Sequence, residues 1–328
     1  MVNIIIPIYN ARDTLPAALD SLVAQTYKIF IVTLVNDCDG VDYSDIIEEY
    51  GRRGLQIHLL YTEKNSGPGV ARQTAIDASG MFDYIMFMDA DDIMMPRCVE
   101  VLYKEAKKGD YDILASSFLN ERNFQAAVMM DVNTTPITWT HGKIYRTKYL
   151  NENGIRFLPE LRLNEDSYFN LVAWNGTDKR ERISECLYLW RDNPNSLTRQ
   201  GESNAFFFNS WDQYIYSQVK GLLKLFDIVG DKMAPELLAA TLINTYKFMM
   251  QALHLKVSNY DKGVAYLAGI QNNPVLLKLM NTRNFWMYIQ QHLPACQLIP
   301  ENELFFYKER FIDWLEKYIK ITQEVVEV

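Results

Sequence analysis

Three aspartates follow directly on an apolar segment, and carboxylates so placed could bind a metal ion. The segment is Tyr84–Met88, and it runs into Asp89, Asp91 and Asp92. An unbroken apolar run predicts a strand buried on both faces, as in parallel sheets, where ligands bind beyond the carboxyl ends of the strands. Carboxylates that converge without basic neighbours repel one another, and a hard divalent cation relieves that repulsion. The alternative is that Asp91 or Asp92 caps the helix expected around Pro96.

The strands expected before this segment also end in polar residues. Parallel strands bring their carboxyl ends to one edge of a sheet, so these residues would line a common cleft. Polar residues also mark any strand-to-loop transition, but several such ends, with the acid cluster among them, favour a binding site. The polar ends are Tyr9-Asn10 after Asn3–Ile8, Asn36-Asp37 after Phe30–Val35, and Glu63–Gly69 after Leu55–Tyr61.

A nucleotide diphosphate is one ligand that these residues could hold. The chain has no GxxxxGK[ST] loop and no GxGxxG after its first strand, which weighs against a P-loop NTPase and a dinucleotide oxidoreductase. A metal that bridges carboxylates and phosphate oxygens is the other common solution. Asp89 and Asp91 point the same way in an extended chain, so one could hold a ribose and the other the metal. Asp37 could accept from a base N–H, and Arg72 could pair with phosphate or with Asp89, unless it is an ordinary surface arginine.

Strand and helix signals alternate over the first 120 residues, which predicts a mostly parallel sheet flanked by helices. The pattern then becomes mixed, with helices expected at Gly142–Leu150 and Glu165–Ala173 and a strand at Arg182–Trp190. We therefore predict a Rossmann-like α/β domain over residues 1–200.

From about Ser203 only helices are expected, which predicts an all-α domain over residues 201–328. The expected helices are Trp211–Phe226, Pro235–Leu255, Tyr260–Ile270, Pro274–Met280 and Leu304–Ile321, with Gly230, Pro274, Pro294 and Pro300 between or beside them.

Composition narrows the class of partner. The 328 residues carry a formal net charge of −8, which disfavours nucleic acid and anionic membranes as partners bound through bulk electrostatics. The 4 cysteines form no CxxC pair, so neither a zinc site nor a disulfide framework is expected. No signal peptide or membrane span is evident in the sequence. We expect a cytoplasmic protein, either free or peripheral at the inner face of a membrane.

Several segments resemble, in order and spacing, the family 2 glycosyltransferases with the GT-A fold. Asn36 stands where that family often has a first Asp, and Gln73 where it usually has Asn. His141, near the acceptor-side segments, could reach the metal or the acceptor, or could be a structural histidine. The segments that carry the resemblance are Ile4–Ala11, Leu19–Leu22, Gln25–Tyr27, Val35–Asp37, the loop Asn65–Gln73, the DxD-like Asp89–Asp92, the acceptor-side Gly142–Arg146 and Gly154–Phe157, and the EDxxF-like Asn164–Phe169.

The resemblance implies transfer of one sugar from a nucleotide diphosphate sugar, usually with inversion, and a Mn²⁺ or Mg²⁺ cofactor. Residues 1–200 would then be the catalytic domain, and the helical domain over residues 201–328 would select the acceptor or form a homo-oligomer. Asp91 would bind the metal, Asp89 the metal or the ribose, and Asp166 would be the general base. The alternative for Asp166 is a helix-terminal acid favoured by the dipole. By the same resemblance the donor would be bound by Pro7, Tyr9, Asn10, Asp37, Asn65, Arg72, Asp89, Ala90 and Asp91.

We expect a UDP-sugar that donates a hexosyl or N-acetylhexosaminyl group to a hydroxyl of a cell-envelope glycan or related polymer. The late loop Arg191–Arg199, with Ser196 and Thr198, resembles a loop near the diphosphate in some relatives. The QxxRW pattern of processive synthases is absent, which favours single addition. The alternatives are a nucleotidyltransferase, a glycosyltransferase acting on modified nucleobases, and a catalytically silent nucleotide-sugar-binding module.

Overall fold

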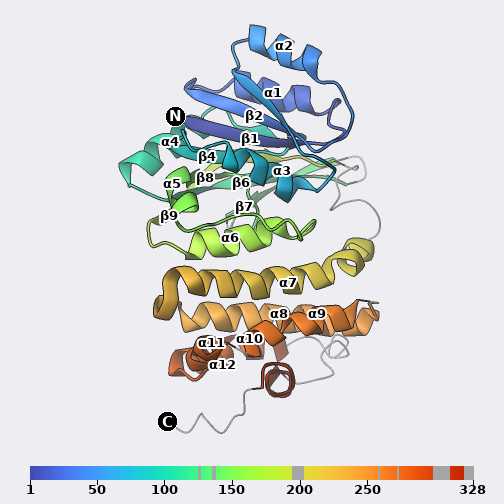
Figure 1. The fold of residues 1–328 in the computed structure, drawn as a ribbon, viewed down its shortest axis with the longest axis vertical. Helices are drawn as coiled ribbons and strands as arrows, with labels where there is room; N and C mark the ends of the chain where they lie inside the picture. Colours follow the sequence, from blue (N-terminus) through green and yellow to red (C-terminus); the bar gives the residue numbers. More distant parts are fainter. Residues whose placement is uncertain are drawn as a thin grey trace. The chain divides into compact units, whose positions relative to one another are not determined.

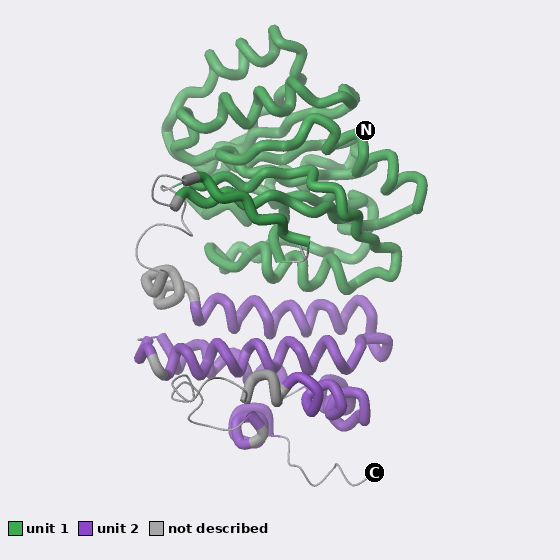
Figure 2. The backbone as a smooth tube through the Cα atoms, turned by 180° about the vertical axis from the view of Figure 1, so that it is seen from behind, with its two compact units in different colours: residues 1–196 green, residues 197–328 purple. Residues whose placement is uncertain are grey.

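The chain forms two compact units, Met1–Ser196 and Leu197–Val328 (Figure 2). The structure, a computed structural model, describes residues 1–124, 127–134, 138–193, 203–257, 259–271, 273–297 and 311–320. The division lies close to the boundary near residue 200 that the sequence predicts. The catalytic and acceptor-selecting roles assigned to the two parts stay predictions.

The first unit is built on one sheet of nine strands, and the first part of that sheet is parallel (Figure 1). In the order β3-β2-β1-β4, the neighbouring strands all pair in parallel. These strands alternate with helices in the chain, as the sequence predicts. The strands are β1 (Val2–Ile8), β2 (Phe30–Asn36), β3 (Ile57–Tyr61) and β4 (Tyr84–Phe87).

The rest of the sheet is mixed. The order continues β4-β8-β6-β9-β5, in which only the β6–β9 pair is parallel, and β7 pairs with β6 off this path. The sheet is therefore less parallel than the first 120 residues indicate, because the later strands are inserted beside β4. They are β5 (Ile93–Met94), β6 (Ile113–Phe124), β7 (Ala127–Asn133), β8 (Lys143–Arg146) and β9 (Arg180–Trp190).

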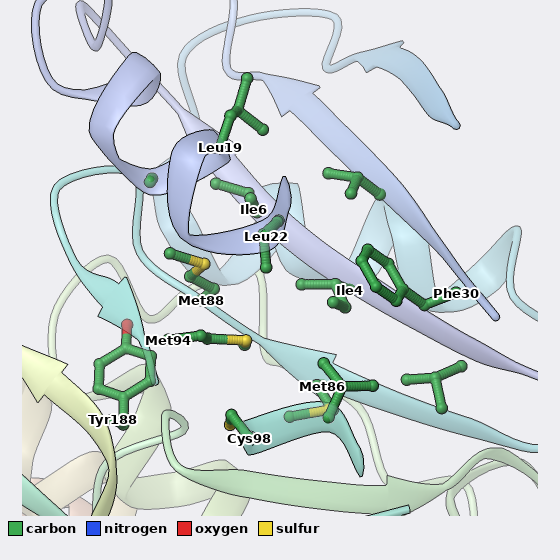
Figure 3. Close-up of a cluster of buried hydrophobic side chains, with 14 of the residues drawn as sticks. Ile4, Ile6, Leu19, Leu22, Phe30, Met86, Met88, Met94, Cys98 and Tyr188 are labelled. Atoms are coloured by element: carbon green, nitrogen blue, oxygen red, sulfur yellow. The ribbon is translucent and has the colours of Figure 1, made fainter. Parts of the chain in front are cut away.

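Helices cover both faces of the parallel strands, which explains their continuous apolar sequences. Ile4 and Ile6 of β1 pack in a core with Leu19 and Leu22 of one helix (Figure 3). Ile5, also fully buried, points to the opposite face, where α3 contacts β1 and β2. The helices of this unit are α1 (Leu15–Val23), α2 (Ser44–Arg52), α3 (Pro68–Asp77), α4 (Cys98–Lys108), α5 (Thr147–Glu152) and α6 (Glu165–Asn175).

One expected helix is wrong. Gly142–Leu150 is not a single helix, because Lys143–Arg146 forms strand β8 between β4 and β6, and only Thr147–Glu152 is helical. A short apolar run does not distinguish a buried strand from a buried helix by its periodicity. Pairing with strands from two other parts of the chain decides for the strand.

The second unit is helical throughout its described residues and has its own core. The core gathers Trp211, Leu242, Met249, Phe285 and Trp314, all buried. Helix α12 is not predicted, since Pro294 indicates a break, but this proline lies in its last turn. The elements are α7 (Ser203–Val229), a 3₁₀ turn (Gly230–Lys232), α8 (Pro235–Leu255), α9 (Tyr260–Tyr266), α10 (Ala268–Gln271), α11 (Pro274–Met280), α12 (Arg283–Gln297), α13 (Phe311–Trp314) and a π-helical turn (Leu315–Ile319).

Part of the last expected helix, Leu304–Ile321, lies outside the described residues, which resume at Phe311. Within the described part of the chain, no helix has both the length and the hydrophobicity needed to cross a bilayer.

Candidate active site

The ends of β1 and β2 form the first wall of the candidate site. Tyr9 leaves β1 with a 51% exposed side chain, and Asn10 follows in the left-handed region at a φ of 49°. The Asn10 N–H donates to Asp39 Oδ2 over 2.8 Å, and the Tyr43 hydroxyl donates to the same oxygen over 2.7 Å. Burial opposes ionisation of Asp39, but these and further donors outweigh it, so its pKa lies below the ordinary value. Asp39 therefore holds the Tyr9-Asn10 turn, a role that sequence reasoning did not assign to it.

Asp37 joins the end of β2 to the loop before α3. Its carboxylate accepts from the Thr62 hydroxyl over 2.7 Å and from the Gly67 N–H over 2.7 Å. The Ser66 N–H donates to both of its oxygens, over 3.0 and 3.1 Å. Asp37 is at the predicted edge of the sheet, but its oxygens already hold this loop. A nucleoside base that bound here would donate to oxygens that already accept hydrogen bonds from the loop. Its contact with Asp37 stays a prediction.

Arg72 connects the acid cluster to helix α6. Its guanidinium donates to Asp89 Oδ1 over 2.7 Å and to Glu165 Oε1 over 2.9 Å. The side chain is buried, so the alternative of a surface arginine is wrong, and the pairing with Asp89 is the one that forms. Burial disfavours the guanidinium charge, but the charges of Asp89 and Glu165 outweigh this and raise the pKa of Arg72.

The amino terminus of α6 presents the predicted base. Helix α6 begins at Glu165, which is buried against Arg72, whereas Asp166 is only partly buried and keeps access to solvent. Asp166 Oδ1 accepts from the Ser167 N–H over 2.7 Å. Burial raises the pKa of Asp166, with Arg72 opposing the shift, and a carboxylate of raised pKa is a better base near neutral pH. Of the two neighbouring acids, Glu165 is paired with Arg72, and Asp166 is the one that remains accessible.

Helices α3 and α6 approach closely at Gly69. A Cβ on Gly69 would lie 2.9 Å from Glu165 Cγ and 3.1 Å from Glu165 Cβ, so any side chain there would push the two helices apart. The neighbouring loop is joined to this region as well, because the Arg162 guanidinium donates to Asn65 Oδ1. The predicted donor-binding residue Asn65 is therefore paired with a residue close to α6.

Lys143 is a charged residue of this region that sequence reasoning did not single out as functional. It lies on β8 with a fully buried side chain, and its ammonium donates to the Trp139 carbonyl. Burial lowers the pKa of Lys143 to about 7, and the charge of Asp166 opposes the shift. Lys143 is thus close enough to Asp166 for their charges to interact.

The acid cluster contacts the segment after β9. Asp91 Oδ2 accepts from Asn193 Nδ2 over 2.7 Å, and Asp92 Oδ1 accepts from the Arg191 N–H over 2.9 Å. The expected position of this late loop near a diphosphate stays a prediction, and Ser196, Thr198 and Arg199 lie outside the described residues. Burial and the charge of Asp89 raise the pKa values of both Asp91 and Asp92.

Asp92 is not a helix cap. Strand β5 follows it, and α4 begins only at Cys98, after Arg97 in the capping position. The fully buried Asp92 instead accepts from the Tyr188 hydroxyl at Oδ2 over 2.7 Å. That hydroxyl also accepts from the Asp89 N–H over 3.1 Å. Tyr188 therefore joins the two ends of the acid cluster. Ala90, between them, is buried.

A possible cation site lies on the inner side of the cluster. Asp89, Asp92 and His141 each offer a ligand atom, and these atoms lie within 4.8 Å of one another. Two carboxylates and a neutral imidazole suit Mn²⁺, which accepts both oxygen and nitrogen donors. The predicted principal ligand, Asp91, is not part of this group. The side chains therefore fit the predicted cofactor, through a set of residues that only partly overlaps the predicted one.

Comparisons with known proteins agree with this geometry. The profile of "Glycosyl transferase family 2" matches residues 3–156. The chain is 30% identical over 250 residues to the glycosyltransferase EpsJ of Bacillus subtilis. This match covers 70% of this chain and 71% of EpsJ. The chain belongs to glycosyltransferase family 2. The resemblance recognised in the sequence is confirmed, and the chain is a glycosyltransferase.

The solved structures confirm the GT-A fold with a helical C-terminal part. Residues 1–349 of Staphylococcus aureus TarS in complex with UDP match with a TM-score of 0.65 and 20% identity, over 90% of this chain and 91% of that one. The mannosyltransferase PcManGT of Pyrobaculum calidifontis, in complex with GDP-Man and Mn²⁺, matches with a TM-score of 0.51 and 12% identity, over 94% of this chain and 88% of that one.

TarS is named as a poly(ribitol-phosphate) β-N-acetylglucosaminyltransferase, and its sequence is 27% identical to this chain over 214 residues. The match covers 61% of this chain and only 36% of TarS, so the chain spans about a third of that relative's length.

Proposed function

We propose that this glycosyltransferase moves one hexosyl or N-acetylhexosaminyl group, with inversion, from a UDP-sugar to a hydroxyl of a cell-envelope polymer. The observation that carries the proposal is the pairing of Arg72 with both Asp89 and Glu165. It brings the acid cluster, suited to a metal–diphosphate complex, next to the helix terminus that presents Asp166. A donor and an acceptor bound there would be within reach of each other.

The nucleotide would bind along the ends of β1 and β2. The exposed ring of Tyr9 offers a face on which a base can stack, and Asp39 holds the turn that presents it. Pro7, Asn10 and Asp37 complete this wall in the proposal, and Asn65 and Ala90 lie on the loops that follow β3 and β4. UDP as the nucleotide is supported by the UDP complex of TarS.

The diphosphate would bind at the acid cluster through Mn²⁺ or Mg²⁺, with Asp89 and Asp91 as the predicted ligands. When bound, the cation neutralises the charge that develops on the leaving diphosphate. The residues of the chain provide the position. Arg72 holds Asp89 from one side, and Asn193 holds Asp91 from the other.

Asp166 would act as the general base. Its Oδ1 is held by the Ser167 N–H, which leaves Oδ2 to take the proton from the acceptor hydroxyl as that oxygen attacks the anomeric carbon. Attack from the face opposite the leaving diphosphate inverts the configuration at that carbon. Burial raises the pKa of Asp166, and the nearby positive charge of Arg72 opposes this shift and so favours the ionised form that a base requires.

The acceptor is proposed by class only. Relatives named for poly(ribitol-phosphate) favour a hydroxyl-bearing envelope polymer. The net charge of −8 disfavours nucleic acid as the acceptor. In the two acceptor-side segments, Lys143–Tyr145 and Phe157 are buried, so these residues shape the core. Contacts with an acceptor would come from other residues.

The test is a thermal-shift screen of UDP, GDP and their sugars with and without Mn²⁺, since ligand binding raises apparent stability. The donor so identified is then incubated with envelope polymers, and UDP release and product configuration are measured. Stabilisation by UDP-sugars and an inverted product support the proposal. Binding without turnover would instead favour a silent module, and pyrophosphate release from a nucleoside triphosphate would favour a nucleotidyltransferase.

A further inference from the structure

Trp139 and Trp190 form a pair of half-buried indole rings for which the proposed transfer has no use so far. Their ring centroids lie 5.7 Å apart at an interplanar angle of 47°. Both rings pack on the core of the first unit and keep part of their surface accessible to solvent. The buried rings of Phe118 and His141 support them, since Phe118 meets both indoles edge-on and His141 stacks against Trp139 at an angle of 13°. The pair is therefore the outer layer of an aromatic cluster.

Trp190 is fixed next to the acid cluster. It is the last residue of β9, and the N–H of the following residue, Arg191, donates to Asp92 Oδ1 over 2.9 Å. Two residues further along, Asn193 Nδ2 donates to Asp91 Oδ2 over 2.7 Å. The backbone at Trp190 is thus one residue away from a direct contact with the acids.

Trp139 is fixed next to the proposed base. The carbonyl of its neighbour Thr138 accepts from Asn170 Nδ2 over 2.8 Å. The same amide group donates to the carbonyl of Asp166 over 3.1 Å, so it holds the segment of Trp139 against the first turn of α6. Because Trp139 is tied to this helix terminus and Trp190 to the acids, the indole pair connects the two halves of the candidate site.

The space between a diphosphate and a general base is where a transferred sugar and an acceptor hydroxyl must meet. A pyranose ring has an apolar C–H face, which packs on an aromatic ring, and a rim of hydroxyls, which needs polar partners. Small-molecule sites combine aromatic walls with a few polar groups in this way. Here the two indoles provide the wall, and the carboxylates of the acid cluster and of Asp166 provide the polar groups.

We propose that Trp139 and Trp190 form the aromatic wall of a subsite that binds a pyranose ring between the acid cluster and Asp166. This deepens the proposed function, on which it rests for the roles of the acids and of the base. The ring is either the transferred hexosyl group of the donor or a sugar of the acceptor, since both present an apolar C–H face. An open-chain alditol phosphate has no such face, so the subsite selects cyclic sugars.

The competing explanation is that both indoles only complete the core. Trp139→Leu and Trp190→Leu separate the two explanations, because leucine keeps an apolar contact and removes the flat aromatic face. Trp139→Phe keeps a smaller aromatic face and should restore part of the binding. The matched control is Trp174→Leu, at a buried indole of α6 over which the guanidinium groups of Arg180 and Arg182 lie. Thermal unfolding is the folding check for every variant.

The experiment is ¹⁹F NMR of the full chain with its 6 tryptophans replaced by fluorotryptophan. Trp139→Phe, Trp174→Phe and Trp190→Phe assign the three resonances of interest. One arm compares UDP with UDP-glucose and UDP-N-acetylglucosamine in the presence of Mg²⁺, which is diamagnetic and leaves the signals sharp. The second arm adds methyl glucoside and methyl N-acetylglucosaminide, with ribitol phosphate as the open-chain probe.

We expect a cyclic sugar to shift the resonances of Trp139 and Trp190 and to leave that of Trp174 in place. A shift with the UDP-sugars beyond that of UDP alone assigns the bound ring to the donor, and a shift with the glycosides assigns it to the acceptor. Trp139→Leu and Trp190→Leu should each weaken binding of that ring about tenfold, which is the order of an aromatic contact. Trp174→Leu should leave the affinity unchanged.

Resonances of Trp139 and Trp190 that respond to no sugar, or that respond equally to ribitol phosphate, overturn the inference. Unchanged affinity for the sugar in a folded Trp139→Leu variant overturns it as well. These measurements need no turnover, so a failed transfer assay counts only against the proposed function. If UDP itself does not bind, the proposed donor is wrong, and the glycosides by themselves decide whether the subsite exists.

Discussion

The two units use burial in different ways. In the first unit, charged side chains are buried at the carboxyl edge of the sheet, among them Arg72, Asp92 and Lys143. In the described part of the second unit, the core is apolar and aromatic, and the buried charge of Asp212 is paired with Lys262 over 2.6 Å. Burying charges lowers stability unless every charge is compensated. The first unit therefore buries several charges close to the candidate site, whereas the described core of the second unit relies on apolar and aromatic packing.

The largest expected effect is on catalysis in the first unit. Asp166→Asn should lower kcat about 10³-fold with little change in KM for the donor or in melting temperature, because it removes a base and keeps the side-chain shape. Steady-state UDP release measures this. The matched control is Asp178→Asn, which changes an exposed aspartate of the same unit. A variant that keeps more than a tenth of the wild-type kcat would remove Asp166 from the mechanism.

The next effect concerns the buried ion pairs. Arg72→Met should lower the free energy of unfolding by about 3–5 kcal/mol, because Asp89 and Glu165 lose their partner and Glu165 is buried. Urea unfolding measures the difference. Arg53→Met, at a half-exposed pair with Asp20, should change the free energy of unfolding far less, because solvent screens that pair. If the two substitutions lowered the free energy of unfolding equally, burial would not be what makes the Arg72 pairs matter for stability.

In the second unit, packing should matter most. A Cβ on Gly263 would lie 2.5 Å from Trp211 Cζ2, so Gly263→Ala should destabilise the protein by about 1–3 kcal/mol. Gly51→Ala is the control, because α2 has open space there, and it should stabilise by about 0.5–1 kcal/mol. Calorimetry measures both. We expect kcat per folded molecule to be unchanged in both variants, because both substitutions lie away from the candidate site. A loss of kcat in Gly263→Ala alone would contradict the separation of roles between the two units.

The smallest expected effect is a dependence on pH. The pKa of Lys143 is lowered to about 7 by burial, so between pH 7 and about 10 the unfolded chain binds a proton that the folded chain does not. Burial of the charged Lys143 ammonium therefore lowers the free energy of unfolding to the full extent below pH 7, and this destabilisation decreases as the pH rises. Lys143→Met should therefore be more stable than the wild type near pH 7 and lose most of that advantage by pH 9.5. A difference that stays constant in urea unfolding at both pH values would contradict the assignment.

Local sequence was enough for the parts of the site that depend on nearby residues. Asp89 and Asp91 could be placed at a strand end because an apolar run precedes them. Asp166 could be placed at a helix start from its own segment. The helical second unit was equally legible, since amphipathic spacing repeats within each helix.

Other parts of the site depend on contacts between distant segments. Glu165 lies 93 residues from its partner Arg72, and Tyr188 lies 96 residues from Asp92. No spacing rule connects such pairs. The alternative that Asp92 caps a helix is wrong for the same reason, because β5, which follows Asp92, pairs with the distant strand β9.

The amino-acid sequence by itself determined the family, the alternation of strands and helices in the first 120 residues, and the position of the acid cluster at a strand end. These follow from periodicity and from motifs, which are properties of neighbouring residues. The tertiary structure alone decided which carboxylates Arg72 holds, which acid of the Glu165-Asp166 pair stays accessible, and that His141 lies beside Asp89 and Asp92. Burial and electrostatics act through space, so these choices exist only once the chain has folded.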